Sequence, residues 1–283
     1  MNKRLILKRK LVNWVVTAVA GIAATVGLFV LLCILYAVAR RGISAINWSF
    51  FTQLPTPAGE AGGGVKNAIV GTLLITGVAA AIGVPLGLLS GTYLAEFGRE
   101  GRFAGAVRFC ADLLMGAPSI VIGVFVYTLL VVPEGHFSAF AGSVSLAIIM
   151  LPLVTCVTED MLKLVPNTLR ESALALGAPN YRMVFQIVFR AARSGLLTGV
   201  ILAIARISGE TAPLLFTALD SPYWTTSMNK PMANLTVTMF NYAMSPWNDW
   251  QAKAWGMSLV ITAGVLMMSL MARFLARERK ARY

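Results

Sequence analysis

The chain has 283 residues, of which 57% are hydrophobic and only 13% are charged. A soluble domain carries roughly a quarter charged residues, so this composition excludes an ordinary soluble protein and indicates a membrane protein. The net charge of +12 does not indicate nucleic-acid binding, because the basic residues stand at the ends of apolar runs, where residues that set membrane topology are found.

Six apolar runs are long enough to be read as membrane spans. A helix needs ~20 apolar residues to cross ~30 Å of hydrocarbon, and a backbone in lipid must satisfy its hydrogen bonds internally, so the runs must be helices. The first run is too long for a cleaved signal peptide, and we expect it to be retained. The sequence therefore predicts an all-α integral membrane protein with about six transmembrane helices, over residues 11–39, 68–95, 107–131, 142–158, 194–219 and 253–272.

The basic residues predict the orientation of these spans. Of the 24 Lys and Arg residues, 18 fall in the segments that lie inside if the N-terminus is cytoplasmic, five fall outside, and Arg206 lies within a span. Both termini are therefore expected in the cytoplasm. We divide the chain into a first helix with its external loop (1–66), a core (67–272) that holds a cytoplasmic segment (159–193), and a basic cytoplasmic tail (273–283).

The cytoplasmic segment is polar and amphipathic, and it reads as two short helices. Asn167 is expected to cap the first helix, Gly177 to end it in a left-handed conformation, and Pro179 to begin the second. From these residues alone, the first helix either inserts into the groove of a partner or lies on the lipid headgroups.

This segment resembles the "EAA" loop in the inner-membrane permeases of binding-protein-dependent ABC importers. The resemblance is carried by Glu171-x-Ala173-x-x-x-Gly177 followed by Ile187, and the sequence departs from the pattern at Ser172 and at Phe189-Arg190. It implies a type I importer bundle in which this loop docks on a cytoplasmic ATPase. The residues expected to couple the chain to that ATPase are Arg170, Glu171, Ser172, Ala173 and Gly177.

A basic and an acidic residue, Arg206 and Glu210, lie deep in the fifth predicted span. Placing a charged side chain near the bilayer centre costs at least ~2.5–3.5 kcal/mol of insertion free energy, so an interaction or a function must offset that cost. On a continuous helix the two would share a face, and they either neutralise each other as an ion pair or face a water-filled path for an anion. Ser208, Gly209 and Pro213 should loosen the helix here, as in many substrate sites.

The string from Ala205 to Ala218 resembles the signature of phosphate permeases of the PstA type. Two further stretches, Gly116 to Val131 and Asn229 to Trp255, support this resemblance, which covers roughly residues 66–272. It implies a multi-pass protein of the bacterial inner membrane that imports phosphate. The implied partners are a second permease of the PstC type, two ATPases of the PstB type and an external phosphate-binding protein of the PstS type. The candidate pathway residues are Arg206, Ser208, Glu210 and Thr211.

Chemistry agrees with phosphate as the substrate, because an arginine fork matches phosphate oxygens and Glu210 could accept the proton that phosphate still carries. Two alternatives remain at this point: an ABC permease for another oxyanion, such as sulfate or molybdate, or a secondary transporter that uses Glu210 as a proton carrier. The chain contains no ATP-binding sequence and no constellation of catalytic residues, so we expect a separate ATPase subunit and no enzyme, metal or cofactor in this chain.

Two further segments near the ends of spans carry an expectation. Asp112 is expected to lie in the headgroup region beside Arg108, four residues before it. The segment from Pro231 to Pro246 is too short for a span, and it either folds back into the bundle as an external gate or lies in the interface, anchored by tryptophans.

Overall fold

The computed structural model describes residues 3–60, 62–98 and 101–277, so the end of the predicted tail (278–283) lies outside the described residues. The chain is built of helices over this part. In chain order they are α1 (Lys3–Ile43), α2 (Trp48–Thr52), α3 (Lys66–Thr92) with the π-helical η1 (Tyr93–Phe97), α4 (Arg102–Gly116), α5 (Ser119–Val126), η2 (Tyr127–Val131), α6 (Val132–Glu134) and α7 (Ala139–Lys163). They continue with α8 (Asn167–Ala175), α9 (Asn180–Arg182), η3 (Met183–Val188), α10 (Phe189–Ile207), α11 (Ala212–Thr217), α12 (Leu235–Ala243) and α13 (Asn248–Arg277).

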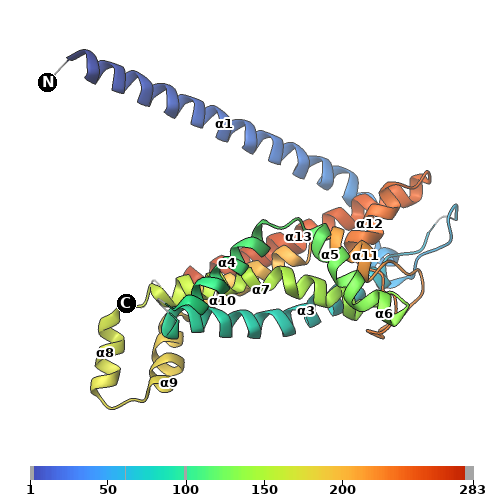
Figure 1. Cartoon of the computed structure of the whole chain (residues 1–283). Helices are drawn as coiled ribbons and strands as arrows, with labels where there is room; N and C mark the ends of the chain where they lie inside the picture. The colour runs from blue at the N-terminus through green and yellow to red at the C-terminus, as the bar shows by residue number, and fades with distance from the viewer. Residues whose placement is uncertain (1–2, 61, 99–100, 278–283) are drawn as a thin grey trace.

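Five stretches of helix are long and apolar enough to cross a membrane, and a sixth is added if α4 and α5 count as one broken span. The long helices α3, α7, α10 and α13 run side by side, whereas α1 extends away from them (Figure 1). Only the end of α1 packs on the bundle, where Gly42 lies against Leu259 of α13. The predicted set of about six spans is thus confirmed for the described residues.

The third predicted span is not one continuous helix. It bends by 105° between α4 and α5. Pro118 stands at the bend, and the residue before it, Ala117, has extended backbone angles (φ −72°, ψ 136°). Proline disfavours helical angles in the preceding residue, which explains why the helix stops at Gly116.

The fifth predicted span, 194–219, is also interrupted. Helix α10 ends at Ile207, and the short helix α11 begins only at Ala212. Ser208 and Gly209 close the end of α10 through backbone bonds to Ile204 and Arg206. The sequence indicated a loosened helix, but the expectation of a single span through residue 219 is wrong.

Helices α3 and α7 form the centre of the bundle. Gly87 and Gly91 of α3 let α7 approach so closely that a Cβ at Gly91 would lie 2.5 Å from the carbonyl oxygen of Thr155. Small residues spaced by four are the usual means of close helix packing in membranes. A buried core surrounds this contact, formed by residues of α3, α7, α10, α11 and α12: Ile75, Ala79, Leu146, Met150, Val154, Ala203, Ile207, Leu214 and Val237.

The segment from Pro231 to Pro246 folds back into the bundle. Residues 232–238 are buried, and Asn234, which is 1% exposed, caps α12 by accepting a bond from the amide of Val237. The amide of Leu235 donates to the hydroxyl of Thr72 on α3 at 2.8 Å. Residues 232–238 thus lie inside the bundle, in agreement with the first of the two positions considered from the sequence, and a gating role stays a prediction.

Candidate functional site

The two broken spans meet at one place in the bundle. Helix α5 packs on α11 so tightly that a Cβ at Gly123 would lie 2.6 Å from the Cα of Pro213. A cavity of about 120 Å³ lies next to this contact, large enough for several water molecules. Its lining comes from α4, the bend, α5, α7 and the α10–α11 break: Leu114, Met115, Ala117, Ser119, Ile122, Ile149, Leu153, Arg206 and Glu210.

Arg206 and Glu210, both described residues, line this cavity without forming an ion pair. Because α10 ends at Ile207, the expected four-residue spacing along one helix does not exist. The ion-pair geometry considered from the sequence is therefore wrong, and both charged groups face a shared space.

The break itself places each charge beside a favourable helix end. Arg206 lies in the last turn of α10, near carbonyl groups that carry partial negative charge. Glu210 precedes the first turn of α11, where amide groups carry partial positive charge. Its backbone carbonyl accepts a hydrogen bond from the hydroxyl of Thr236, at 2.9 Å, which ties α12 to the break.

The other two pathway candidates lie elsewhere. The hydroxyl of Ser208 donates to the carbonyl of Ala205 at 2.8 Å and so closes the end of α10. Thr211 lines a different, mostly apolar cavity of about 660 Å³ between α11, α12 and α13. The structure thus brings Arg206 and Glu210 together and leaves Ser208 and Thr211 outside their cavity, whereas Ser119, which the sequence did not indicate, is inside it.

The second candidate site is the coupling segment, residues 159–193. Its helices α8 and α9 project from one end of the bundle, opposite to the end where α6, α11 and α12 lie (Figure 1). Gly177 has a φ of +81°, which confirms the predicted left-handed end of α8. Glu171 and Ser172 are exposed, whereas Ala173 packs into a core formed with Leu162, Val184 and other residues.

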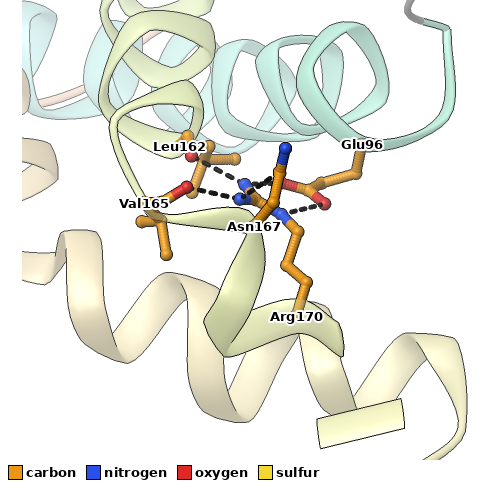
Figure 2. A network of polar contacts seen from close by, with 5 residues as sticks. All are labelled: Glu96, Leu162, Val165, Asn167 and Arg170. Carbon is orange, nitrogen blue, oxygen red and sulfur yellow. Dashed lines mark hydrogen bonds and ion pairs between the residues drawn. The ribbon is translucent and has the colours of Figure 1, made fainter. Parts of the chain in front are cut away.

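Arg170 points into the protein, not outward. Its side chain is 8% exposed and pairs with Glu96 of η1, whose side chain is 3% exposed. Nε and Nη2 donate to the two carboxylate oxygens at 3.1 and 2.6 Å, as Figure 2 shows. Removing one partner of such a buried pair generally costs about 3–5 kcal/mol, because the other charge is left without compensation.

Asn167 does not cap α8 as expected. The helix begins at Asn167, the residue before it is Pro166, and no side chain caps this end. The side-chain oxygen of Asn167 instead accepts a bond from Nη1 of Arg170 at 3.3 Å. The predicted cap is wrong because Asn167 is already the first residue of the helix, and the capping position is occupied by Pro166, whose side chain has no acceptor.

Arg108 pairs with an acidic residue of another helix. Its Nε pairs with Glu159 of α7 at 2.8 Å, and Nη2 donates to the carbonyl of Leu94 at 3.1 Å. Glu159 also pairs with Lys163, one turn further along α7. Asp112 is exposed and lies on α4 with Arg108, four residues apart, but no ion pair joins these two described residues.

Neither the role of Glu96 nor the link from Glu159 to Arg108 could be found from the sequence. Both acidic residues stand near the ends of spans, where charged residues commonly face water, and Arg170 and Arg108 lie 74 and 51 residues away from them. Pairing over such separations leaves no periodic signal in the sequence.

Two broken helices that meet at a cavity, one of them carrying charged residues there, together with a projecting helical hairpin, are features of a transport permease. A family model, "binding-protein-dependent transport system inner membrane component", matches residues 83–281. The fold is also similar to that of an inward-facing methionine ABC transporter, MetNI, with a TM-score of 0.63 and 17% identity over 76% of this chain and 95% of that chain.

The phosphate transport system permease protein PstA of Yersinia pestis is 49% identical over 254 residues, which are 90% of this chain and 86% of the relative. PstA of Haemophilus influenzae is 47% identical over 96% of both chains. The chain therefore belongs to the binding-protein-dependent transport permeases and, within them, to the PstA family.

Proposed function

We propose that this chain is the permease subunit of an ATP-driven phosphate importer in the bacterial inner membrane and forms half of its translocation path. The observation that carries this proposal is the cavity between the two broken spans, at which the break between α10 and α11 presents Arg206 and Glu210. A guanidinium group binds phosphate oxygens through two parallel hydrogen bonds and stays charged at every working pH. Broken helices near the middle of the membrane are a common way to build such a site.

Glu210 supports phosphate over sulfate or molybdate. Phosphate near neutral pH still carries a proton that a carboxylate can accept as a hydrogen bond, whereas fully deprotonated oxyanions would be repelled. The relatives are phosphate permeases, which also favours phosphate. Membership in a family of binding-protein-dependent permeases favours an ATP-driven importer over a secondary transporter.

The partners follow from this assignment. Relatives of this kind are permease subunits and not enzymes themselves, so ATP hydrolysis belongs to a separate subunit of the PstB type. We assign a PstC-type permease to the other half of the path and a PstS-type binding protein to phosphate delivery. The surface offered to the ATPase is the projecting end of α8 and α9, where Glu171 and Ser172 are exposed and Leu176 is 89% exposed.

Reconstitution in liposomes tests the function. The four subunit types together should accumulate phosphate only when ATP is present, and an excess of sulfate should not compete. Phosphate uptake by this chain alone, driven by an ion gradient, would support the secondary transporter instead. Equal competition by sulfate or molybdate would contradict phosphate as the specific substrate and favour a permease for another oxyanion.

The topology can be tested separately. A reporter fused after Arg282, beyond the described residues, should be cytoplasmic, because the C-terminal tail is one of the basic segments. Reporters inserted near Gly62 or Pro222 should be external, because the segments around them contain few basic residues. The activity of a reporter that works on only one side of the membrane measures this. An external C-terminus would imply an odd number of spans and contradict the importer.

Gly177→Val should impair transport while leaving membrane insertion intact. A β-branched residue strongly disfavours a φ of +81°, so α8 and α9 should reorient. No atom lies within 4 Å of a Cβ at this position, which makes the effect one of backbone conformation alone. We expect ATP-dependent uptake to fall severely, measured together with copurification of the ATPase.

Gly177→Asn is the matched control for this variant. Asparagine tolerates the left-handed conformation better than other non-glycine residues, so uptake should be largely retained. Equal uptake by the Val and Asn variants would indicate that the geometry of the α8–α9 turn does not matter and that the segment only lies on the membrane surface.

A further inference from the structure

Arg170 forms a cluster with four neighbours, Glu96, Leu162, Val165 and Asn167, drawn in Figure 2. A guanidinium group has five N–H donors, and each of the five has an acceptor here. Nε and Nη2 donate to Glu96, Nη1 donates to the Val165 carbonyl and to Asn167, and Nη2 also donates to the Leu162 carbonyl. Arg170 therefore has no donor left for a partner subunit.

The acceptors come from three parts of the chain. Leu162 and Val165 belong to the carbonyl end of α7 and the turn after it, where a cation is favourable. Asn167 is at the start of α8 itself. Glu96 lies in η1, the continuation of α3, and is 74 residues from Arg170 in sequence. The cluster thus joins the coupling helix to the ends of both central helices.

Apolar packing reinforces the same junction. Ala95 of η1, Leu162 of α7 and Ala173 of α8 belong to one buried cluster. Above it, α3 and α7 are in close contact along their length through Gly87 and Gly91. A displacement of α8 would therefore disturb its packing against η1 and break the bidentate ion pair. Such a pair holds only in one geometry.

We infer that Glu96 is a positioning residue which, through Arg170, fastens α8 to the end of α3, so that motion of the coupling segment is passed to the central helices directly. This inference rests on the proposed role of residues 159–193 in contacting the ATPase. It assigns to Arg170 an internal role in place of contact with the ATPase. It also adds Glu96, from a different part of the chain, to the residues that couple the two subunits.

The first test measures coupling in the full complex. Glu96→Gln keeps the size of the side chain but removes its charge, and we expect the phosphate imported per ATP hydrolysed to fall about tenfold, a coupling effect of ordinary size. ATP hydrolysis itself should persist. Glu96→Asp keeps the charge and should restore a large part of the ratio. A purely structural role would lower the amount of complex and leave the ratio unchanged, which would overturn the inference.

Arg108→Gln, outside the coupling segment, is the control. It removes the partner of Glu159 on α4 at the same end of the bundle, from a pair that does not include α8. The ratio of transport to hydrolysis should stay within about twofold of wild type. A loss equal to that of Glu96→Gln would mean that any broken ion pair at this end uncouples the complex, and the specific role of Glu96 would be refuted.

The second test does not depend on the transported substrate. Spin labels at Leu169 and Phe97, both exposed, report the distance between α8 and the end of η1. Cys33, Cys110 and Cys156 are replaced by serine first. In the otherwise wild-type complex the distance distribution should be the same with and without ATP, and in Glu96→Gln it should broaden or shift between the two states.

These readouts separate the two hypotheses. If the distance is fixed in the wild-type complex and released in Glu96→Gln, the linkage holds even if the complex fails to import phosphate, and only the proposed function is contradicted. If the distance changes with ATP in the complex that retains Glu96, or is unaffected by Glu96→Gln, the linkage is refuted even though phosphate is imported.

Discussion

Replacing Arg206 with glutamine should reduce phosphate uptake by about 10- to 100-fold while the protein still inserts into the membrane. Arg206 is the cation that lines the cavity between the two broken spans. A hydrogen bond to a charged group is worth about 1.5–3 kcal/mol, and a phosphate that has lost its hydration would lose such bonds here. Insertion should be unaffected, because a neutral side chain is easier to place at this depth than a charged one.

Arg206→Lys tests geometry separately from charge. Lysine keeps the positive charge but presents a compact ammonium group in place of a planar fork. We expect partial uptake at best. The apparent affinity for phosphate should fall, whereas the amount of inserted protein should change little. Uptake is measured with radiolabelled phosphate in the reconstituted complex, and insertion by protease protection.

The double variant Arg206→Gln with Glu210→Gln distinguishes a transport role from mutual neutralisation. If the two residues only made each other tolerable in the membrane, removing both charges should leave uptake normal. The structure places Arg206 in the last turn of α10 and Glu210 in the break that follows, with no ion pair between them, so we expect the double variant to be as impaired as Arg206→Gln. Uptake at the wild-type level by a correctly inserted double variant would refute the anion path.

The number and length of the spans could be predicted because hydrocarbon thickness fixes how many apolar residues a helix needs. The positions of the two helix breaks were harder to predict. Pro118 and the Ser208-Gly209 pair are local signals of a weak helix, yet prolines also occur inside continuous helices of this chain, such as Pro85 in α3 and Pro152 in α7. Whether a proline bends a helix depends on neighbouring helices that replace the lost backbone bonds, and sequence spacing does not contain that information.

The candidate site could be predicted only in part, because the sequence shows unusual residues but not the contacts between helices. A charged residue deep in a span, such as Arg206, stands out against its apolar surroundings because of its cost, and its chemistry follows from its type. The partners of Arg108 and Arg170 could not be predicted, since spacing along one helix suggests only neighbours three or four residues away. Their actual partners, Glu159 and Glu96, are brought close by the packing of different helices.

Gly71→Ala should displace the buried outer segment and destabilise the protein. Gly71 of α3 faces the backbone of this segment, and a Cβ there would lie 1.9 Å from the carbonyl oxygen of Ala233. No rotamer change can relieve a clash with backbone, so we expect a cost at or above the ~1–3 kcal/mol of ordinary overpacking. The melting temperature of the purified protein should fall by roughly 5–10 °C.

The same variant should also affect the substrate cavity. Displacing Ala233 moves Thr236, whose hydroxyl holds the backbone carbonyl of Glu210. We therefore expect phosphate uptake to fall even at temperatures where the variant remains folded. A cysteine at Asn234, 1% exposed in the structure, should become reactive to a bulky polar thiol reagent in Gly71→Ala and stay protected without it.

Gly77→Ala on the same helix is the control, because a Cβ at Gly77 meets no atom within 4 Å. Alanine favours a helix over glycine by about 1 kcal/mol, so this variant should melt at the wild-type temperature or slightly above it. The contrast between two identical substitutions at Gly71 and Gly77 isolates the contact with Ala233 from any general effect on α3. If Gly71→Ala melts and transports like Gly77→Ala, then the outer segment does not press on α3 as described, and its connection to Glu210 through Thr236 has no part in holding the cavity.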